Sequence, residues 1–249
     1  MKYFLAKISF ILVITTILTS CSVTKNLEDD EYFLTTNNIT VNNKDSNNET
    51  IKNIIKPKPN SLFLGYPLRL RIYNLANKSP DSTFNNWLKR KPKREQRLHN
   101  LLSKKQTIKL QRAYTGINNW LKKSGEPPAL IDSIKINKSV SYIKKYHQQN
   151  GWHDIDVRYD IEYFDNKKGE INYSIETGVP YLIDSITYEI DSKVVDSIYD
   201  INKQNSFIKI NTQYRENNLV NERERINNIM RNSGLYTFEK ESTSEMLSE

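Results

Sequence analysis

Residues 155–176, IDVRYDIEYFDNKKGEINYSIE, decide how this chain of 249 residues is expected to fold. Apolar side chains alternate strictly with charged ones over Ile155–Tyr163, and apolar side chains alternate with polar ones again over Ile171–Ile175. A period of two is typical of strands with one apolar and one wet face. The turn residues Asp165–Gly169 lie between the two runs, so the stretch predicts an antiparallel hairpin.

A helix is expected immediately before this hairpin, over Ser139–Gln149. Helical spacing turns these side chains toward the core: Val140, Ile143 and either Tyr146 or His147. Asn150-Gly151 then predicts the end of the helix, because glycine readily takes the left-handed conformation of a helix C-terminus.

Upstream, the alternation in Tyr32–Val41 predicts another strand, followed by an Asn-rich loop at 42–50. The fold of residues 51–130 stays open, and Leu68–Asn74 fits either an extended segment or a short helix. The stretch Trp87–Lys123 is expected to be helical. Four of its side chains share one helix face: Leu110, Tyr114, Ile117 and Leu121.

The chain also contains an internal repeat. Ile143–Asp156 aligns without gaps with Ile226–Glu239, at an offset of 83 residues (226 − 143). A strand is predicted from Tyr181 onward (YLIDSITYEID), helices at 192–203 and 211–232, and a further strand from Leu235. The first repeat then has the order strand, helix, helix, strand, strand, and the second has the same order without its final strand.

This order and several local motifs resemble the POTRA domains, which are the periplasmic modules of the BamA/TamA family of outer-membrane assembly proteins. The motifs are Asn221–Phe238, the bridge Gly178-Val179-Pro180-Tyr181, and Gly65-Tyr66-Pro67 before Leu68–Asn74. The resemblance implies an α+β fold of tandem POTRA-like β-α-α-β-β modules after a cleaved lipoprotein signal peptide. The expected boundaries are a signal peptide at 1–20, an acylated N-terminus and polar tether at 21–31, an enlarged POTRA-like module at 32–178 and a second, incomplete module at 179–249.

The resemblance implies a non-enzymatic protein for translocation and assembly of outer-membrane proteins. Its partners would be unfolded outer-membrane protein clients, a second assembly module, and the membrane through a lipid anchor. Clients would bind by β-strand addition, in which main-chain groups at a sheet edge pair with an incoming segment. The family pattern favours the strand after the second helix, which gives this candidate edge: Ile155, Asp156, Val157, Arg158, Tyr159 and Asp160.

The sequence departs from the family because the modules leave no room for the transmembrane β-barrel that family members carry. Two alternatives therefore stay open: a standalone scaffold lipoprotein that docks a partner complex, or a truncated, non-functional remnant of a barrel protein.

The first residues predict export. The apolar run Ile8–Leu18 has the length of a signal-peptide core and is too short to span a bilayer. Leu18, Thr19, Ser20 and Cys21 resemble the bacterial lipobox, which implies cleavage before Cys21 and diacylglycerol on its thiol. The alternative is an ordinary secretory signal with a chance cysteine. Ser22 in place of aspartate favours the outer membrane, with the modules facing the periplasm.

Composition excludes several kinds of chemistry. Cys21 is the only cysteine, so no intramolecular disulfide and no Cys-x-x-Cys site can form. Glycine-rich phosphate-binding motifs are absent among the seven glycines. His147 and His153 lie near Asp154 and Asp156, but their spacing favours surface or core-edge histidines over a metal site. We expect no catalytic residue, no metal and no cofactor.

The net charge of +8 is concentrated in one region. This basic run consists of Lys89, Arg90, Lys91, Lys93, Arg94, Arg97, Lys104, Lys105, Lys109 and Arg112. Nucleic acid is not an expected partner of an exported lipoprotein. Two interpretations stay open: a solvated helix face, or contact with anionic lipid headgroups.

Overall fold

The computed structural model of the chain describes residues 23–24, 27–91 and 93–243. Their elements, in chain order, are β1 (Phe33–Val41), β2 (Lys44–Asp45), α2 (Glu49–Ile54), α3 (Leu68–Leu75), α4 (Pro80–Lys89), α5 (Arg94–Leu101), α6 (Lys104–Ser124), α7 (Ser133–Gln148), β3 (Ile155–Phe164), β4 (Lys168–Thr177), α8 (Lys193–Asn202), η1 (Lys203–Asn205), α9 (Glu216–Asn232) and η2 (Lys240–Ser242). The fold is α+β, as predicted.

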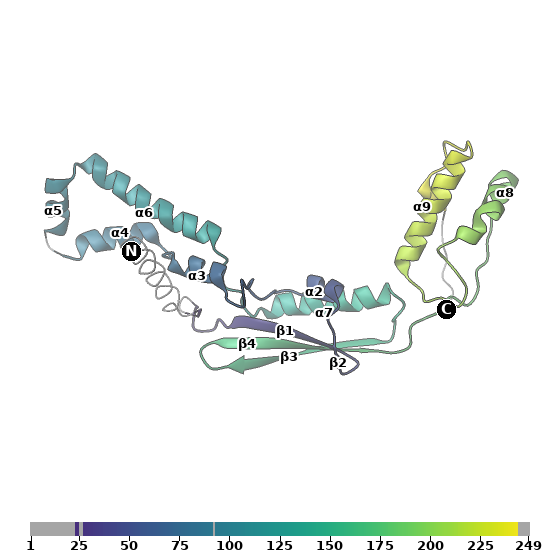
Figure 1. The fold of residues 1–249 in the computed structure, drawn as a ribbon, viewed down its shortest axis with the longest axis horizontal. Helices are drawn as coiled ribbons and strands as arrows, with labels where there is room; N and C mark the ends of the chain where they lie inside the picture. Colours follow the sequence, from purple (N-terminus) through teal and green to yellow (C-terminus); the bar gives the residue numbers. More distant parts are fainter. Residues whose placement is uncertain (1–22, 25–26, 92, 244–249) are drawn as a thin grey trace, which may run out of the picture. The chain divides into compact units, whose positions relative to one another are not determined.

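The four strands form one mixed sheet in the order β2-β1-β4-β3 (Figure 1). The expected hairpin is present as β3 and β4. β1 runs parallel to β4, because hydrogen bonds advance along both strands together: Phe33 N to Lys167 O at 2.9 Å, and Asn42 N to Ile175 O at 2.8 Å. The strand that closes the hairpin therefore lies at the centre of the sheet, between β1 and β3.

The chain divides into two compact units that interleave along the sequence. The first takes residues up to Asn38, Pro57–Ser133 and Asp160–Asn172. The second takes Ile39–Lys56, Ile134–Tyr159 and the residues from Tyr173 on. Strands β1, β3 and β4 contribute residues to both units, so each unit is described separately.

In the second unit, α2 and α7 lie on the same face of the sheet (Figure 1). Fully buried side chains form its core: Ile51, Ile55, Ile136, Ile143, Tyr173 and Ile175. Ser139 connects α7 to Lys56, which follows α2, since its hydroxyl donates to Lys56 O and accepts from Lys56 N, both at 2.8 Å. The inward position is taken by His147, which is buried, rather than by Tyr146, which is half-buried.

The helices α7 and α9 end in the same way, at the offset of the sequence repeat. Gly151 and Gly234 both have left-handed backbone conformations, with φ of +88° and +95°. After each glycine the next N–H donates back into the helix, from Trp152 to His147 O and from Leu235 to Met230 O, both at 3.0 Å. Buried positions repeat as well, because Met230 lies at the place of His147.

The strands predicted in the second repeat do not form. Residues 181–191 are irregular apart from one bridge, between Leu182 and Gln213. Leu235–Phe238 contains a turn, closed by a 3.0 Å hydrogen bond from Phe238 N to Leu235 O, instead of a strand. The predictions from periodicity were wrong here because a strand needs a hydrogen-bonded neighbour in addition to alternating side chains.

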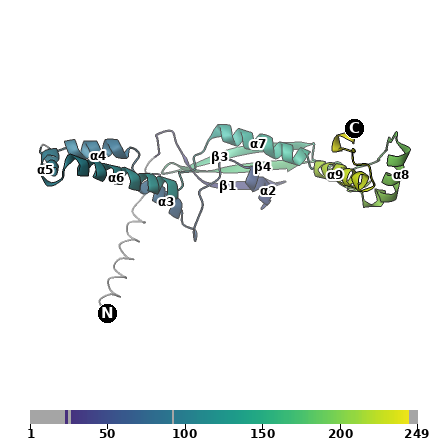
Figure 2. The same cartoon turned by 90° about the horizontal axis from the view of Figure 1, so that it is seen from above.

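In the first unit, residues 68–124 fold as the helices α3 to α6, and α4 lies alongside α6 (Figures 1 and 2). Leu68–Asn74 is helical, within α3. The side chains buried in α6 are Thr107 and Asn118, whereas Ile117, on the predicted apolar face, is 59% exposed. Asn118 accepts a hydrogen bond from Asn77 N at 2.6 Å, so a polar contact takes the inward position.

The buried imidazole of His147 makes the stability of this fold depend on pH. Its Nδ1 donates to Ile143 O at 2.9 Å, and burial lowers the pKa of His147 below its ordinary value. The unfolded chain then takes up the proton first as the pH falls. We expect the free energy of unfolding to decrease below about pH 6.5, by at most about 1.4 kcal/mol per pH unit.

The variant His147→Met places at this position the side chain that the second repeat has there, Met230. The free energy of unfolding of this variant should depend less on pH than that of the wild type. Urea unfolding curves recorded from pH 7.5 to pH 5 measure this dependence. The reciprocal variant Met230→His should steepen it. Equal slopes in wild type and His147→Met would show that His147 does not cause the effect.

Candidate functional site

The predicted strand-addition residues all lie on β3, which is an edge strand. In the sheet order, β3 has a single neighbour, β4. An edge strand presents main-chain N–H and C=O groups that another strand can pair with. The sheet therefore places Ile155–Asp160 where strand addition is geometrically allowed, while binding of a client there stays a prediction.

On one face of β3 the apolar side chains are buried or half-buried, and on the other face the charged side chains contact solvent. Val157 is buried at 5% exposure, and Ile155 and Tyr159 are half-buried. On the wet face, Arg158 Nε lies 2.6 Å from Asp156 Oδ2. An exposed ion pair of this kind adds little stability. Its charges instead disfavour pairing of two identical edges.

The opposite edge strand, β2, has only two residues, and the outer side of β1 has partners at both of its ends. At one end of β1, Phe33 forms a bridge with Leu130. At the other end, β2 pairs with Thr40 and Val41, and Ser46 N donates to Ile39 O at 2.9 Å. Because β1 already has outer partners, β3 is the better candidate for an incoming strand.

The junction between α7 and β3 is tightly built. A Cβ on Gly151 would lie 2.8 Å from Tyr214 O, so only glycine fits both this contact and the left-handed φ. The His153 ring packs against the Tyr181 ring, with centroids 4.7 Å apart and the ring planes tilted by 40°. Within the described residues, no three His, Cys, Asp or Glu side chains come together in a way that could hold a metal ion.

Glu222 and Arg225 form a buried ion pair that the sequence did not predict. Arg225 Nη2 lies 2.6 Å from Glu222 Oε1, and both side chains are almost fully buried. Burial opposes ionisation of Glu222, but hydrogen bonds from Arg225 and from Phe207 N outweigh it and lower the pKa of this carboxyl. Arg225 also donates to Asn202 O at 3.0 Å, so the pair fastens α8 to α9. The only signal in the sequence was the helical i, i+3 spacing of the two residues.

The basic run lies on the end of α4, on α5 and its preceding link, and on the first half of α6; we call residues 80–124 the basic arm. Nine of the ten basic residues are exposed: Lys89, Arg90, Lys91, Lys93, Arg97, Lys104, Lys105, Lys109 and Arg112. Arg94 is half-buried, with its guanidinium 4.8 Å from the Trp87 ring centroid. The arm thus presents a dense cationic surface.

Apolar side chains are exposed on the same arm. Trp120 is 62% exposed, and Ile108, Ile117 and Trp87 are exposed as well. The sequence did not predict that Ile117 is exposed, because the helical spacing placed it on one apolar face with Leu121. Cationic and aromatic side chains together are typical of a surface that meets the interface of a membrane.

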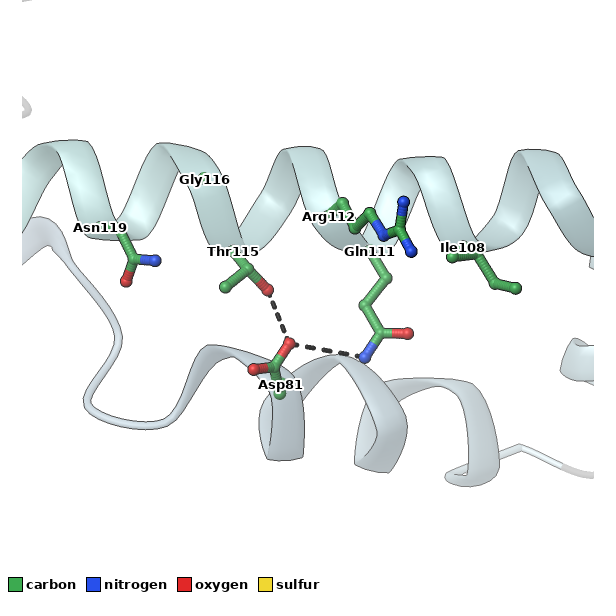
Figure 3. Close-up of a pocket in the computed structure, with 7 residues that line it drawn as sticks. All are labelled: Asp81, Ile108, Gln111, Arg112, Thr115, Gly116 and Asn119. Atoms are coloured by element: carbon green, nitrogen blue, oxygen red, sulfur yellow. Dashed lines mark hydrogen bonds between the residues drawn. The ribbon is translucent and has the colours of Figure 1, made fainter.

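A shallow groove of about 460 Å³ lies between α4 and α6 (Figure 3). At its floor the Asp81 carboxylate accepts hydrogen bonds from Thr115 Oγ1 at 2.7 Å and from Gln111 Nε2 at 3.5 Å. These bonds join the two helices of the arm, and we assign Asp81 a structural role.

Cys21 and the lipobox residues Leu18, Thr19 and Ser20 lie outside the described residues. None of the helices in the described part of the chain combines the length and the apolar character needed to cross a membrane. No protein-family model, no curated protein and no solved structure matches the chain. The POTRA resemblance therefore stays a prediction from the sequence motifs and from the predicted order of the elements.

Proposed function

We propose that this protein is an outer-membrane lipoprotein whose POTRA-like sheet binds extended segments of outer-membrane protein clients by strand addition along β3. The observation that carries the proposal is the position of β3, a strand of ten residues with one neighbour, whereas the other edge strand, β2, has only two residues. Main-chain pairing suits unfolded clients because it depends little on their sequence.

The arrangement of the elements supports this function. The elements β1, α2, α7, β3 and β4 follow the β-α-α-β-β order of the resemblance, with the short β2 added after β1 and with α3 and the basic arm inserted between the two helices. Both helices cover one face of the sheet, and the side chain of Ser139 connects α7 to Lys56, which follows α2.

Photo-crosslinking along β3 tests strand addition. A photoreactive residue in place of Arg158 or Asp160 should capture unfolded outer-membrane proteins, because these exposed positions flank the edge backbone. The control is Lys44 on the other edge strand, β2, which has two residues and is too short for extended pairing, so capture there should be weak. Equal capture at Lys44 would contradict the proposal. A single folded partner at all positions would favour the scaffold alternative, and no capture would favour the remnant.

Lipidation at Cys21 is tested separately. Labelled palmitate should enter the wild-type chain and not the Cys21→Ala variant, because the thiol carries the diacylglycerol in the resemblance. Fractionation should place the wild type with the outer membrane and release part of the variant. Equal label in both proteins would contradict the anchor.

We propose that the basic arm adds a contact with anionic lipid, favoured by its exposed cations and exposed Trp87 and Trp120. Each cation near an anionic surface contributes about 1 kcal/mol, so Lys91, Lys93 and Arg97 changed together to Gln should weaken vesicle binding by about two orders of magnitude. The measurement is cosedimentation with phosphatidylcholine vesicles with and without phosphatidylglycerol, in the Cys21→Ala background.

Matched exposed lysines outside the arm provide the control. Lys138, Lys145 and Lys209 changed together to Gln remove the same number of charges and should weaken binding far less. If both triple variants lose affinity equally, the arm is only a solvated face and net charge explains the binding. Added salt should also weaken arm binding, because it screens exposed charges.

A further inference from the structure

A tight turn precedes α3 in the first unit. Phe63 and Tyr66 form an isolated antiparallel bridge, with hydrogen bonds from Phe63 N to Tyr66 O at 2.8 Å and from Tyr66 N to Phe63 O at 3.0 Å. Leu64 and Gly65, between them, have φ of +50° and +76°. Positive φ at both central residues is typical of a two-residue type I′ turn. We call Leu62–Gly65 the apolar turn.

The side chains of the apolar turn contact solvent. Leu62 is 65% exposed, Phe63 is 64% exposed and Leu64 is 92% exposed. A Cβ on Gly65 would meet no atom of the described residues within 4 Å. A run of three large apolar side chains with this exposure is unfavourable in water, and such runs mark contacts with a membrane or with another molecule.

The backbone at Leu64 is unfavourable for leucine. A left-handed φ brings the Cβ of any side chain too close to the backbone, and asparagine tolerates this conformation better than leucine does. Asn-Gly is a favoured sequence for a type I′ turn. Leu64 therefore gives the fold neither packing nor a favoured backbone conformation. A contact beyond the described part of the chain would account for its apolar side chain.

The fold fastens both ends of the apolar turn. Before the turn, the buried Asn60 donates from Nδ2 to Pro127 O and accepts at Oδ1 from Ala129 N, both at 2.8 Å. After the turn, the Arg71 guanidinium lies 4.6 Å from the centroid of the Tyr66 ring. These contacts hold the turn in its exposed position.

The predicted lipid anchor is connected to the helix that follows the turn. Asn74, in the last turn of α3, is buried and donates from Nδ2 to Val23 O at 3.2 Å. Cys21 precedes Val23 by two residues, and two residues of chain span at most about 7 Å. From Leu68 to Asn74, α3 rises by about 9 Å. Lipid on Cys21 would therefore bring a membrane surface within reach of the apolar turn.

The charge around the turn also fits a membrane surface. Residues 51–80 contain six basic residues and no acidic one. Lys58 and Arg69, on either side of the turn, are exposed. The carboxylate of Glu126 lies at the base of the turn, where it accepts from Ser61 N at 3.2 Å. Apolar side chains flanked by cations are typical of segments that insert at a membrane interface.

We propose that the apolar turn inserts into the lipid bilayer that holds the Cys21 anchor, with Leu62, Phe63 and Leu64 below the headgroups. The inference rests on the proposed anchor and goes beyond it, because it states which part of the first unit faces the membrane. It is independent of the basic arm, since burial of apolar side chains needs no anionic lipid and is not screened by salt.

A fluorescent label on the turn tests insertion. Lipid would occupy the thiol of Cys21, the only cysteine, so Phe63→Cys adds a single free thiol for an environment-sensitive dye. The lipidated chain is placed in phosphatidylcholine vesicles that contain a nitroxide lipid. The emission at residue 63 should shift to the blue and be quenched, in low and in high salt. The control label at Asp160→Cys, on the strand edge proposed for clients, should show neither change.

The variant Leu64→Asn separates insertion from folding. Its Asn-Gly turn should leave the free energy of unfolding, measured in urea, equal to or above that of the wild type. The blue shift and the quenching of the label at residue 63 should nevertheless decrease. The control Leu101→Asn changes another exposed leucine, outside the turn, and should leave both signals unaltered.

The outcomes distinguish this proposal from the anchor. If the chain stays with the vesicles but the label at residue 63 shows no blue shift, this proposal is overturned and the anchor stands. If the chain does not stay with the vesicles, the anchor fails and this proposal fails with it. A blue shift without quenching by the nitroxide lipid would also overturn the proposal, because protein and not lipid would then cover the turn.

Discussion

The pairing of β4 with two neighbours is the constraint on which the rest of the sheet depends. β4 is the last strand of its repeat in sequence and the central one in space, parallel to β1 and beside β3. Buried main-chain groups must find hydrogen-bond partners, and β4 supplies them to strands on both sides. This placement leaves β3 as an edge strand with one neighbour, whereas β2 and Leu130 pair with the outer side of β1.

Buried polar side chains determine how the helices of each repeat pack against their neighbours. In the first repeat, Ser139 bonds both main-chain groups of Lys56. In the second, Glu222 lies at the same repeat position (222 − 139 gives 83) and bonds Phe207 N and Arg225. A buried donor or acceptor left unpaired costs about 1–3 kcal/mol, so each contact selects one arrangement of its helix pair.

Local patterns predicted the elements that complete their own hydrogen bonds or pair with a close neighbour. The hairpin and the strand ending at Val41 formed where periodicity placed them, and the helix before Gly151 formed but begins at Ser133 instead of Ser139. The same reasoning failed for residues 181–191, whose alternation is as clear as that of β1. It also failed to identify the inward face of α6, where Asn118 is buried and Ile117 is exposed.

The sequence by itself determined the α+β class, the hairpin, the 83-residue repeat and the concentration of positive charge, because these depend on residue type and spacing along the chain. Only the tertiary structure decided that β3 is an edge, that β2 and Leu130 pair with the outer side of β1, and that the apolar residues of 181–191 are exposed. Those properties depend on which segments pair in space. For a strand, the neighbour supplies the hydrogen bonds that side-chain periodicity cannot specify.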